Sequence, residues 1–296
     1  MKRKKFAAVI IIALCTLWLV ACFQEDSIQV AMVVSTKEGN FFQELVEGAQ
    51  IGAEEMDHSL EVYYSNNRSD LEYEHIEELI EDQVDVIIIN PVNSDAVYPA
   101  VQLANNAGIP VITVDRASTG GEVVSHITSD NVSGGRQAAT YIIEQLGNQG
   151  EYGELMGLQG TSAAKQRGQG FNDVMIDDSQ MTLTATLVAD FDRVKGYEAT
   201  KQLLEVQPDL KAIFAHNDEM ALGAIQAMKE ADLSLLIVGF DGIDEALKAL
   251  AEGDLAATIA QQPKQMGSLA FITAIQHVKG QEVDKLIMVD VKLISQ

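Results

Sequence analysis

Short apolar runs alternate with helix-length amphipathic segments along almost the whole chain after residue 27. Between 212 and 228, for example, the run AIFA is followed by the polar HNDE and then by an apolar stripe that includes Met220, Ala224 and Met228. Such runs, bounded by polar or turn residues, predict β-strands, and the stripes predict one buried helical face. The predicted strands are IQVAMVV, LEVYYS, VDVIIIN, IPVITVD, VVSHITSD, GELMGLQ, MTLTATLVA, LKAIFAH, LSLLIVGFD and LAATIAQ.

This alternation predicts parallel sheets joined by right-handed helical crossovers. Ten strands approach the practical limit of one open sheet, and a chain of 296 residues with 47% hydrophobic residues can bury two cores. We therefore expect an α/β protein with two doubly wound lobes. The expected crossings between the lobes are SDNVSGGRQ (129–137), AQQPK (260–264) and the C-terminal run IMVDVKLI.

The first twenty-two residues differ from the rest. A basic segment, 2–5, precedes an apolar stretch, 6–20, that is shorter than the roughly 20 residues of a membrane-spanning helix. The stretch ends in Leu-Val-Ala-Cys, which resembles the lipobox of bacterial lipoproteins. We expect a signal peptide at 1–21, a lipid-bearing Cys22 and a linker to residue 27. The alternative is an ordinary cleaved signal followed by a free cysteine, and either signal directs the protein out of the cytoplasm.

The chain is strongly acidic, with 20 basic and 44 acidic residues and a net charge of −24. Loss of the basic signal segment would leave 16 basic residues and a net charge of −28. Such a charge repels phosphate backbones, so no nucleic-acid partner is expected. Attachment to a membrane would then depend on acyl chains rather than on basic patches. Cys15 leaves with the signal, so no intramolecular disulfide is expected.

Motifs of catalysis are absent from the sequence. It contains no GxSxG elbow, no Walker P-loop, no HExxH and no calcium-binding loop, and its five histidines are scattered. We therefore expect no catalytic residue, no metal site and no cofactor.

Polar and aromatic residues gather where the predicted strands end. Carboxylate, amide and guanidinium groups bind sugar hydroxyls, and aromatic rings cover the C–H faces of a sugar ring. Each residue alone has a structural alternative, since Asp115 and Asp241 could be turn residues, and Asn217 a helix cap. The strand-end residues are Ser35, Thr36, Phe41, Phe42, Asn90, Asp115, Arg116, Arg167, Phe191, Asn217, Asp241 and Gln261.

Nine motifs, in order along residues 28–296, together resemble the bacterial periplasmic ribose-binding proteins, which are type I solute-binding proteins of ABC importers. The motifs are VVSTKEGNFF, INPVNSDAV, PVITVDRAS, GEVVSHITSDNVSGG, GTSAAKQRGQGF, ADFDRVKG, HNDEMALGA, IVGFDG and ATIAQQP. The resemblance implies two α/β lobes joined by a three-strand hinge, with the sugar closed between them. We assign 28–129 plus 262–288 to the N-terminal lobe and 130–261 plus 289–296 to the C-terminal lobe.

Matched motif by motif, the resemblance implies a set of sugar contacts. These are Ser35, Asn40, Phe41, Phe42, Asn90, Asp115, Arg116, Arg167, Phe191, Asn217, Phe240, Asp241 and Gln261. One segment departs from the family, which usually has TLNNPFF where this chain has TKEGNFF. Gly39 stands at a usual asparagine contact, so either Asn40 reaches the same hydroxyl or one hydrogen bond is lost.

The implied function is that of a monomeric, lipid-anchored receptor on the extracellular face of the membrane or in the periplasm. It would capture a pentose, with D-ribose as first choice, and deliver it to an ABC permease and its ATPase without breaking a bond. Because of Gly39, a receptor for another small sugar or for a furanose signal such as autoinducer-2 is the alternative. A LacI-type transcription regulator shares the two-lobed fold, but this chain begins with an export signal rather than a helix-turn-helix. A sugar-converting enzyme is the weakest alternative.

Overall fold

The computed structural model describes residues 28–177 and 180–296, in which strands and helices alternate as the sequence pattern predicts. The predicted signal peptide, the predicted anchor Cys22 and the linker to residue 27 lie outside the described residues. None of the helices described is both long enough and apolar enough to cross a bilayer.

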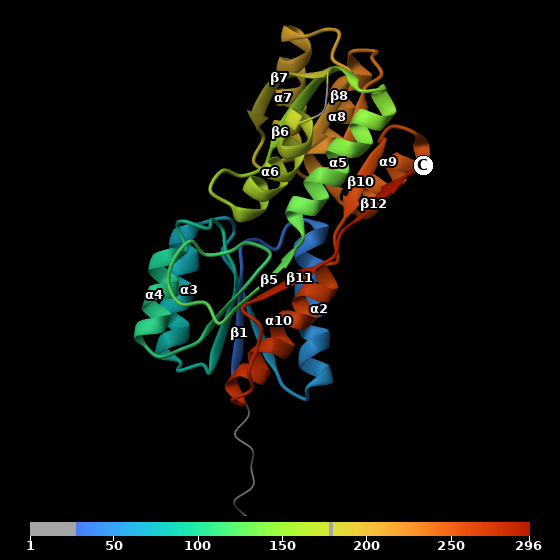
Figure 1. Cartoon of the computed structure of the whole chain (residues 1–296). Coiled ribbons are helices and arrows are strands. Elements are labelled where there is room, and N and C mark those ends of the chain that lie inside the picture. Colours follow the sequence, from blue (N-terminus) through green and yellow to red (C-terminus); the bar gives the residue numbers. More distant parts are fainter. Residues whose placement is uncertain (1–27, 178–179) are drawn as a thin grey trace, which may run out of the picture.

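The first sheet has six parallel strands in the order β11-β5-β4-β3-β1-β2. These strands are β1 (Val30–Val34), β2 (Leu60–Tyr64), β3 (Val86–Asn90), β4 (Val111–Val114), β5 (Ser125–Ser129) and β11 (Leu286–Val289). Its helices are α2 (Asn40–Glu55), α3 (Ser69–Glu81), α4 (Tyr98–Asn106) and α10 (Pro263–Val278). In Figure 1 this is the lower lobe, with α3 and α4 on one side of the sheet and α2 and α10 on the other.

The second sheet also has six strands, in the order β12-β10-β9-β8-β6-β7. These strands are β6 (Gln149–Met156), β7 (Gln180–Val188), β8 (Ala212–Ala215), β9 (Leu236–Asp241), β10 (Ala257–Ala260) and β12 (Lys292–Ser295). Its helices are α5 (Asn131–Leu146), α6 (Ser162–Asp177), α7 (Arg193–Val206), α8 (Asp218–Glu230) and α9 (Asp244–Glu252). All neighbouring strands are parallel except β12, which is antiparallel to β10.

The direction of β12 differs from the all-parallel expectation for a physical reason. Only Asp290 and Val291 separate β11 from β12. A parallel connection needs a crossover of a dozen residues or more to return the chain to the starting edge of the sheet. The chain instead runs straight from the carboxyl edge of one sheet into the second sheet.

The chain passes between the lobes three times, after β5, after β10 and between β11 and β12. Figure 1 shows these three passages close together where the lobes meet. The predicted fold, two doubly wound α/β lobes joined by three connections, is confirmed. The residue boundaries assigned to each lobe stay a prediction.

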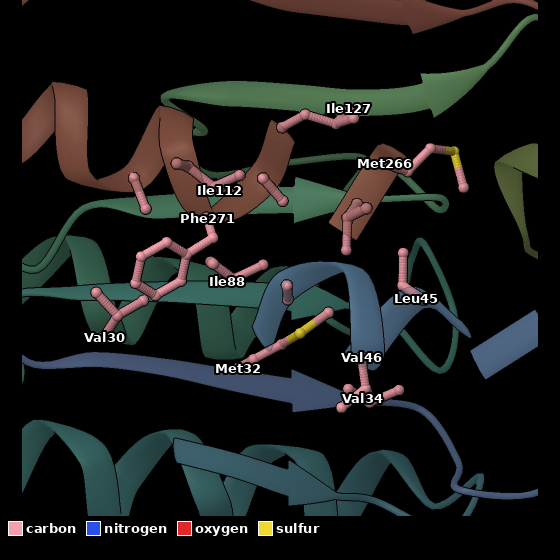
Figure 2. Packing of buried hydrophobic residues seen from close by; sticks show 14 of the residues in the cluster. Val30, Met32, Val34, Leu45, Val46, Ile88, Ile112, Ile127, Met266 and Phe271 are labelled. Atoms are coloured by element: carbon pink, nitrogen blue, oxygen red, sulfur yellow. The ribbon is translucent and has the colours of Figure 1, made fainter. Parts of the chain in front are cut away.

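The strands of the first sheet are apolar on both faces because helices cover both. Val30, Met32 and Val34 of β1 pack in the cluster beneath α2 and α10, which includes Phe271. Figure 2 shows this layer of side chains between the strands and the two helices. Residues between them in β1, such as Val33, pack in the opposite cluster beneath α3 and α4. This two-sided burial explains the unbroken apolar runs that mark parallel strands.

Helices α2 and α10 approach each other at two glycines. A Cβ atom on Gly48 would lie 1.9 Å from the carbonyl oxygen of Lys264, and one on Gly267 would lie 1.9 Å from that of Leu45. Real atoms do not approach so closely, so each glycine is required by the contact between the helix backbones. This contact holds α2, which carries Phe41 near its start, against α10.

We predict that Gly48→Ala destabilises the protein. In an open helix this change would stabilise by up to about 1 kcal/mol, but here the new methyl group must push α10 away, with an expected net cost of about 1–3 kcal/mol. Urea unfolding followed by circular dichroism measures the difference. Gln50→Ala, an exposed change in the same helix, is the control and should stay within about 0.5 kcal/mol. A stabilised Gly48→Ala protein would contradict the close packing.

Candidate functional site

A cavity of about 370 Å³ lies between the two lobes, where strands of both sheets end. Its wall in the first lobe consists of Thr36, Glu38, Gly39, Asn40, Phe41, Phe42, Asn67, Asp115 and Arg116. The opposite wall consists of Ala163, Arg167, Asp190, Phe191, Asp192, Arg193, Asn217, Glu219, Asp241 and Ile243, with Gln261 on a crossing segment. Open α/β sheets hold ligands at the carboxyl ends of their parallel strands, in the crevice at the point where the strand order reverses.

Asp115 follows β4, and side chains outside the cavity wall hold its carboxylate in place. Its φ is 65°, a left-handed conformation that is uncommon for residues other than glycine. The amide of Asn90 donates to Asp115 Oδ2 at 3.0 Å, and the hydroxyl of Ser35 donates to Asn90 Oδ1 at 2.7 Å. Ser35 and Asn90 are fully buried and absent from the cavity wall. The structure therefore places these two predicted contacts behind Asp115, whose carboxylate they orient.

Arg116 is a buried cation on the same wall, only 5% exposed. Its Nη1 donates to the carbonyl oxygens of Pro91 and Val92 at 3.1 and 3.0 Å, and its Nε lies 3.6 Å from Asp115 Oδ2. Burial lowers the pKa of Arg116, while Asp115 opposes that shift. The guanidinium is thus fixed at one side and turned toward the cavity at the other.

Arg167, on α6, brings the second buried guanidinium to the cavity. Its Nε donates to Asn131 Oδ1 at 2.9 Å, and its Nη1 donates to the carbonyl oxygen of His216. The same Nη1 lies 3.4 Å from Asp241 Oδ1. The guanidinium carbon stands 3.8 Å from the centre of the Phe240 ring. Phe240 is fully buried and absent from the wall, so the structure places this predicted contact beneath Arg167.

Asp241 is connected through hydrogen bonds to two of the segments that cross between the lobes. Gln261 donates from Nε2 to Asp241 Oδ1 at 2.6 Å, and Ser129 donates from its hydroxyl to Gln261 Oε1 at 2.6 Å. Ser129 ends one crossing strand and Gln261 follows another. Burial raises the pKa of Asp241 to about 7, although Arg167 opposes the rise.

Asp218, the first residue of α8, holds the loop that carries Asp241. Its Oδ2 accepts from the amides of Gly242 and Ile243 at 2.7 and 3.0 Å, and its Oδ1 accepts from the Thr258 hydroxyl at 2.7 Å. Burial and the neighbouring charge of Asp241 raise the pKa of Asp218. The sequence pattern identifies only an acid in the first helical turn, whereas the structure shows a fully buried brace.

Three phenylalanine rings provide the aromatic part of the wall. Phe41 and Phe42 meet edge to face, with ring centres 5.3 Å apart. The ring of Phe191 lies 5.7 Å from the guanidinium carbon of Arg116 and 5.7 Å from that of Arg167. Phe191 therefore lies near both cations and lines the cavity.

Asn217 is both a helix cap and part of the cavity wall. Its Oδ1 accepts from the Met220 amide at 3.0 Å, and its Nδ2 lies 3.3 Å from the carbonyl oxygen of Phe191. The polar segment before α8 thus combines both roles in one residue. Its neighbour Glu219 pairs with Arg193 at 2.7 Å on the cavity wall.

The start of α2 offers the cavity few polar atoms. Gly39 has a φ of 91°, and a Cβ placed on it would meet only Phe42, at 3.8 Å. The side-chain amide of Asn40 donates to Glu44 Oε1 at 3.3 Å. Asn40 lines the cavity, but its amide nitrogen is directed along the helix.

Ten of the thirteen predicted contacts line the cavity, and Ser35, Asn90 and Phe240 lie behind it. The sequence interpretation missed other wall residues. Asp190 and Asp192 flank Phe191 in a strand-end motif, so extending the strand-end criterion to neighbours would have found them. The missed residues are Glu38, Asn67, Ala163, Asp190, Asp192, Arg193, Glu219 and Ile243, whereas Thr36, a strand-end residue of the sequence pattern, also lines the cavity.

The arrangement suits a small, neutral, polyhydroxylated molecule. Two carboxylates can accept hydrogen bonds from hydroxyl groups, two guanidiniums can donate to them, and the rings can cover C–H faces. Across residues 28–177 and 180–296, no group of three or more potential ligands is placed to hold a metal ion.

Comparisons with known proteins agree with this geometry. The model of the periplasmic binding protein domain matches residues 30–282. The "Ribose import binding protein RbsB" of Haemophilus influenzae is 47% identical over 90% of this chain and 91% of that protein. The protein of the same name from Escherichia coli is 45% identical over 90% of each chain. A solved structure of the periplasmic binding protein of the arabinose ABC transporter from Shewanella sp. ANA-3, bound to L-arabinofuranose, is 31% identical with a TM-score of 0.84, over 90% of this chain and 91% of that one.

We predict that Asp241→Asn stabilises the ligand-free protein at pH 8 but much less at pH 5. A pKa raised from 3.8 to about 7 means that the stabilising effect of the bound proton is full at low pH and is lost as pH rises through 7. The neutral amide has no such loss, so the difference in unfolding free energy should grow by more than about 1 kcal/mol between pH 5 and 8. Urea unfolding at both pH values measures it, with the exposed Asp209→Asn as control. A difference that does not change with pH would contradict the buried, protonatable carboxyl.

Proposed function

The chain belongs to the periplasmic binding protein family as a homologue of the ribose import binding proteins, and we propose that it captures D-ribose between its two lobes and delivers the sugar to the permease of an ABC importer. As a member of this family it is a solute-binding protein rather than an enzyme. The permease and its ATPase are the partners that this role requires.

One observation carries the proposal: each lobe presents a buried guanidinium and a carboxylate to the same cavity. Asp115 and Arg116 come from one lobe, and Arg167 and Asp241 from the other. A polyhydroxylated guest can bond to all four only when the lobes are closed over it. Binding should therefore shift the lobes from open to closed arrangements.

Within this proposal the predicted residues fall into two groups, those that contact the sugar and those that stand behind these contacts. Asp115, Arg116, Arg167, Asn217, Asp241 and Gln261 bind hydroxyl groups, Asn40 borders the sugar, and Phe41, Phe42 and Phe191 cover its C–H faces. Ser35, Asn90 and Phe240 support the first group from behind. A hydrogen bond to a charged group contributes about 1.5–3 kcal/mol, so a sugar that lacks one matched hydroxyl should bind roughly 10- to 150-fold more weakly.

The start of α2 favours a second candidate ligand. Gly39 has no side chain and the Asn40 amide bonds to Glu44, so this edge of the cavity contributes less hydrogen bonding than an asparagine at 39 would. A different small sugar or a furanose signal such as autoinducer-2 is the alternative. Calorimetry with D-ribose, other pentoses, hexoses and autoinducer-2 distinguishes the two, and binding of another compound without binding of D-ribose would exclude our first choice.

We further propose that Cys22 carries lipid and that the protein works at the extracellular face of the membrane or in the periplasm. The support is the sequence of the signal and its terminal Leu-Val-Ala-Cys. The two lobes would comprise 28–129 plus 262–288 and 130–261 plus 289–296, with the hinge where the chain crosses between the sheets.

We predict that Asp115→Ala abolishes stabilisation by D-ribose. At a ribose concentration 100-fold above the Kd, the unmodified protein should gain about 2.7 kcal/mol of unfolding free energy, seen as a rise in Tm. The variant removes the carboxylate that Asn90 holds toward the sugar and should show no shift. Asp209→Ala, an exposed change outside the cavity, should behave as the unmodified protein does. An unchanged shift in Asp115→Ala would remove Asp115 from the site.

We predict that Cys22→Ser releases the protein from the membrane. A thioether to lipid needs the thiol, and the acidic chain offers no alternative attraction to anionic lipids. Fractionation of cells expressing each form should place the unmodified protein with membranes and the variant in the soluble fraction. Recovery of both forms in the soluble fraction would support a cleaved signal without a lipid anchor.

A further inference from the structure

Glu72 on α3 is a buried carboxylate outside the cavity wall. It is 1% exposed, although glutamate is almost never buried without a partner. Its Oε1 accepts from the amide of Val92 at 2.7 Å. Its Oε2 is buried and has no hydrogen-bond partner within the part of the chain that the structure describes. The proposed sugar contacts do not account for this side chain.

The segment that Glu72 holds is also held by Arg116. The amide of Val92 donates to Glu72, while the carbonyl oxygens of Pro91 and Val92 accept from Arg116 Nη1. Like Glu72 Oε2, Arg116 Nε is buried and has no hydrogen bond among the described residues. Glu72 thus holds the peptide unit between Pro91 and Val92 through its N–H, and Arg116 holds that unit and the next one through their carbonyl oxygens.

The Glu72 carboxylate helps to balance the buried positive charge of Arg116. A buried guanidinium is costly unless carboxylates lie nearby. Asp115 is one such group, but it accepts from Asn90 and faces the cavity, where hydroxyl groups of a guest would bond to it. Glu72 supplies a second negative charge that no guest can reach, and its field acts on Arg116 together with those of Asp115 and Asp241.

The same segment continues into the contact between the lobes. The side-chain amide of Asn93 donates to the carbonyl oxygen of Gln159 at 3.0 Å, and the Ser94 amide donates to that of Gly160 at 2.8 Å. The amide of Ser162 donates to the Ser94 hydroxyl at 3.0 Å. A residue that fixes 91–92 therefore influences both a cavity cation and the neighbouring contact between the lobes.

We propose that Glu72 is a positioning residue for sugar binding, whose negative charge holds Arg116 and the 91–92 segment in the geometry that binds the guest. The inference rests on the proposed function and extends it to a residue that never touches the sugar. Burial raises the pKa of Glu72 to about 7, against the effects of the Val92 hydrogen bond and of Arg116. The charge therefore changes within an accessible pH range.

Glu72→Gln tests the charge at nearly constant shape, because the amide oxygen can still accept from Val92. D-ribose affinity is measured by calorimetry between pH 5.5 and 8.5 for both proteins. At pH 8.5 the variant should bind at least about 10-fold more weakly. At pH 5.5 the two affinities should converge, because Glu72 is then protonated in the unmodified protein. Asp241 titrates in both proteins, so its effect cancels in the ratio.

The control is Glu77→Gln, the same chemical change on the exposed face of α3, which should bind as the unmodified protein does at every pH. Equal affinities of Glu72→Gln and the unmodified protein at every pH would overturn the proposal. A loss of affinity that is the same at every pH would also overturn it, because it would indicate a role in packing alone. Failure of the unmodified protein to bind D-ribose would instead reject the ligand proposed above.

A measurement on the unmodified protein covers the case in which Glu72→Gln fails to fold. If the charged form binds D-ribose better, then D-ribose must lower the pKa of Glu72 by reciprocity. The carboxyl carbon resonance of Glu72, followed by NMR through a pH titration, should show a lower midpoint with ribose than without it. An unchanged midpoint would reject the proposal.

Discussion

Two guanidinium groups and two carboxyl groups that face one cavity are the constraint on which the rest of the structure depends. Arg116 and Arg167 are each about 95% buried or more, and their nearest cavity carboxylates are Asp115 and Asp241. Because these side chains are themselves largely buried, each charge must be matched by hydrogen bonds or by an opposite charge. The surrounding side chains provide this matching without filling the cavity. A neutral polyol can then complete the hydrogen bonding, which a hydrophobic guest could not do.

Strained backbone conformations at the strand ends also place side chains on the cavity wall. Asp115, Phe191 and Asp241 have φ values of 65°, 62° and 128°, which side chains of L-residues rarely adopt. Each is held by neighbours. Asn90 binds the carboxylate of Asp115, Asp218 binds the amides after Asp241, and Gly157 leaves room for the Phe191 ring, which a Cβ atom would approach to 2.1 Å. Strain of about 1–3 kcal/mol per residue persists only where the surrounding structure fixes it, as it does here.

The cavity is also connected to the segments that join the lobes. Gln261 bonds to Asp241 on the wall and to Ser129 at the end of a neighbouring crossing strand. On the first lobe, the segment that Arg116 and Glu72 hold continues into Asn93 and Ser94, which bond to the second lobe. The proposed sugar contacts are thus separated by about one hydrogen bond from residues that lie on the crossing strands or contact the opposite lobe. Hydrogen bonds therefore connect the cavity wall to the segments that join the lobes and to the contact between them.

The sequence by itself determined the alternation of strands and helices, the two lobes and half of the cavity wall, ten of its twenty residues. Burial on both faces of a parallel strand leaves an unbroken apolar run, and polar residues such as Asp115 and Asn217 interrupt it at the strand ends. The tertiary structure decided which polar residues face the cavity and which stand behind it. Ser35 and Asn90 share the strand-end pattern and Phe240 belongs to a matched motif, but all three pack one layer deeper. Asp218 and Glu72 look like ordinary helical acids until their distant partners are known, and β12 runs antiparallel. Local sequence pattern predicts burial and the period of an element. The hydrogen bonds by which Glu72 and Arg116 hold the same 91–92 segment join residues far apart in the chain, so they depend on how the sheet brings its strands together.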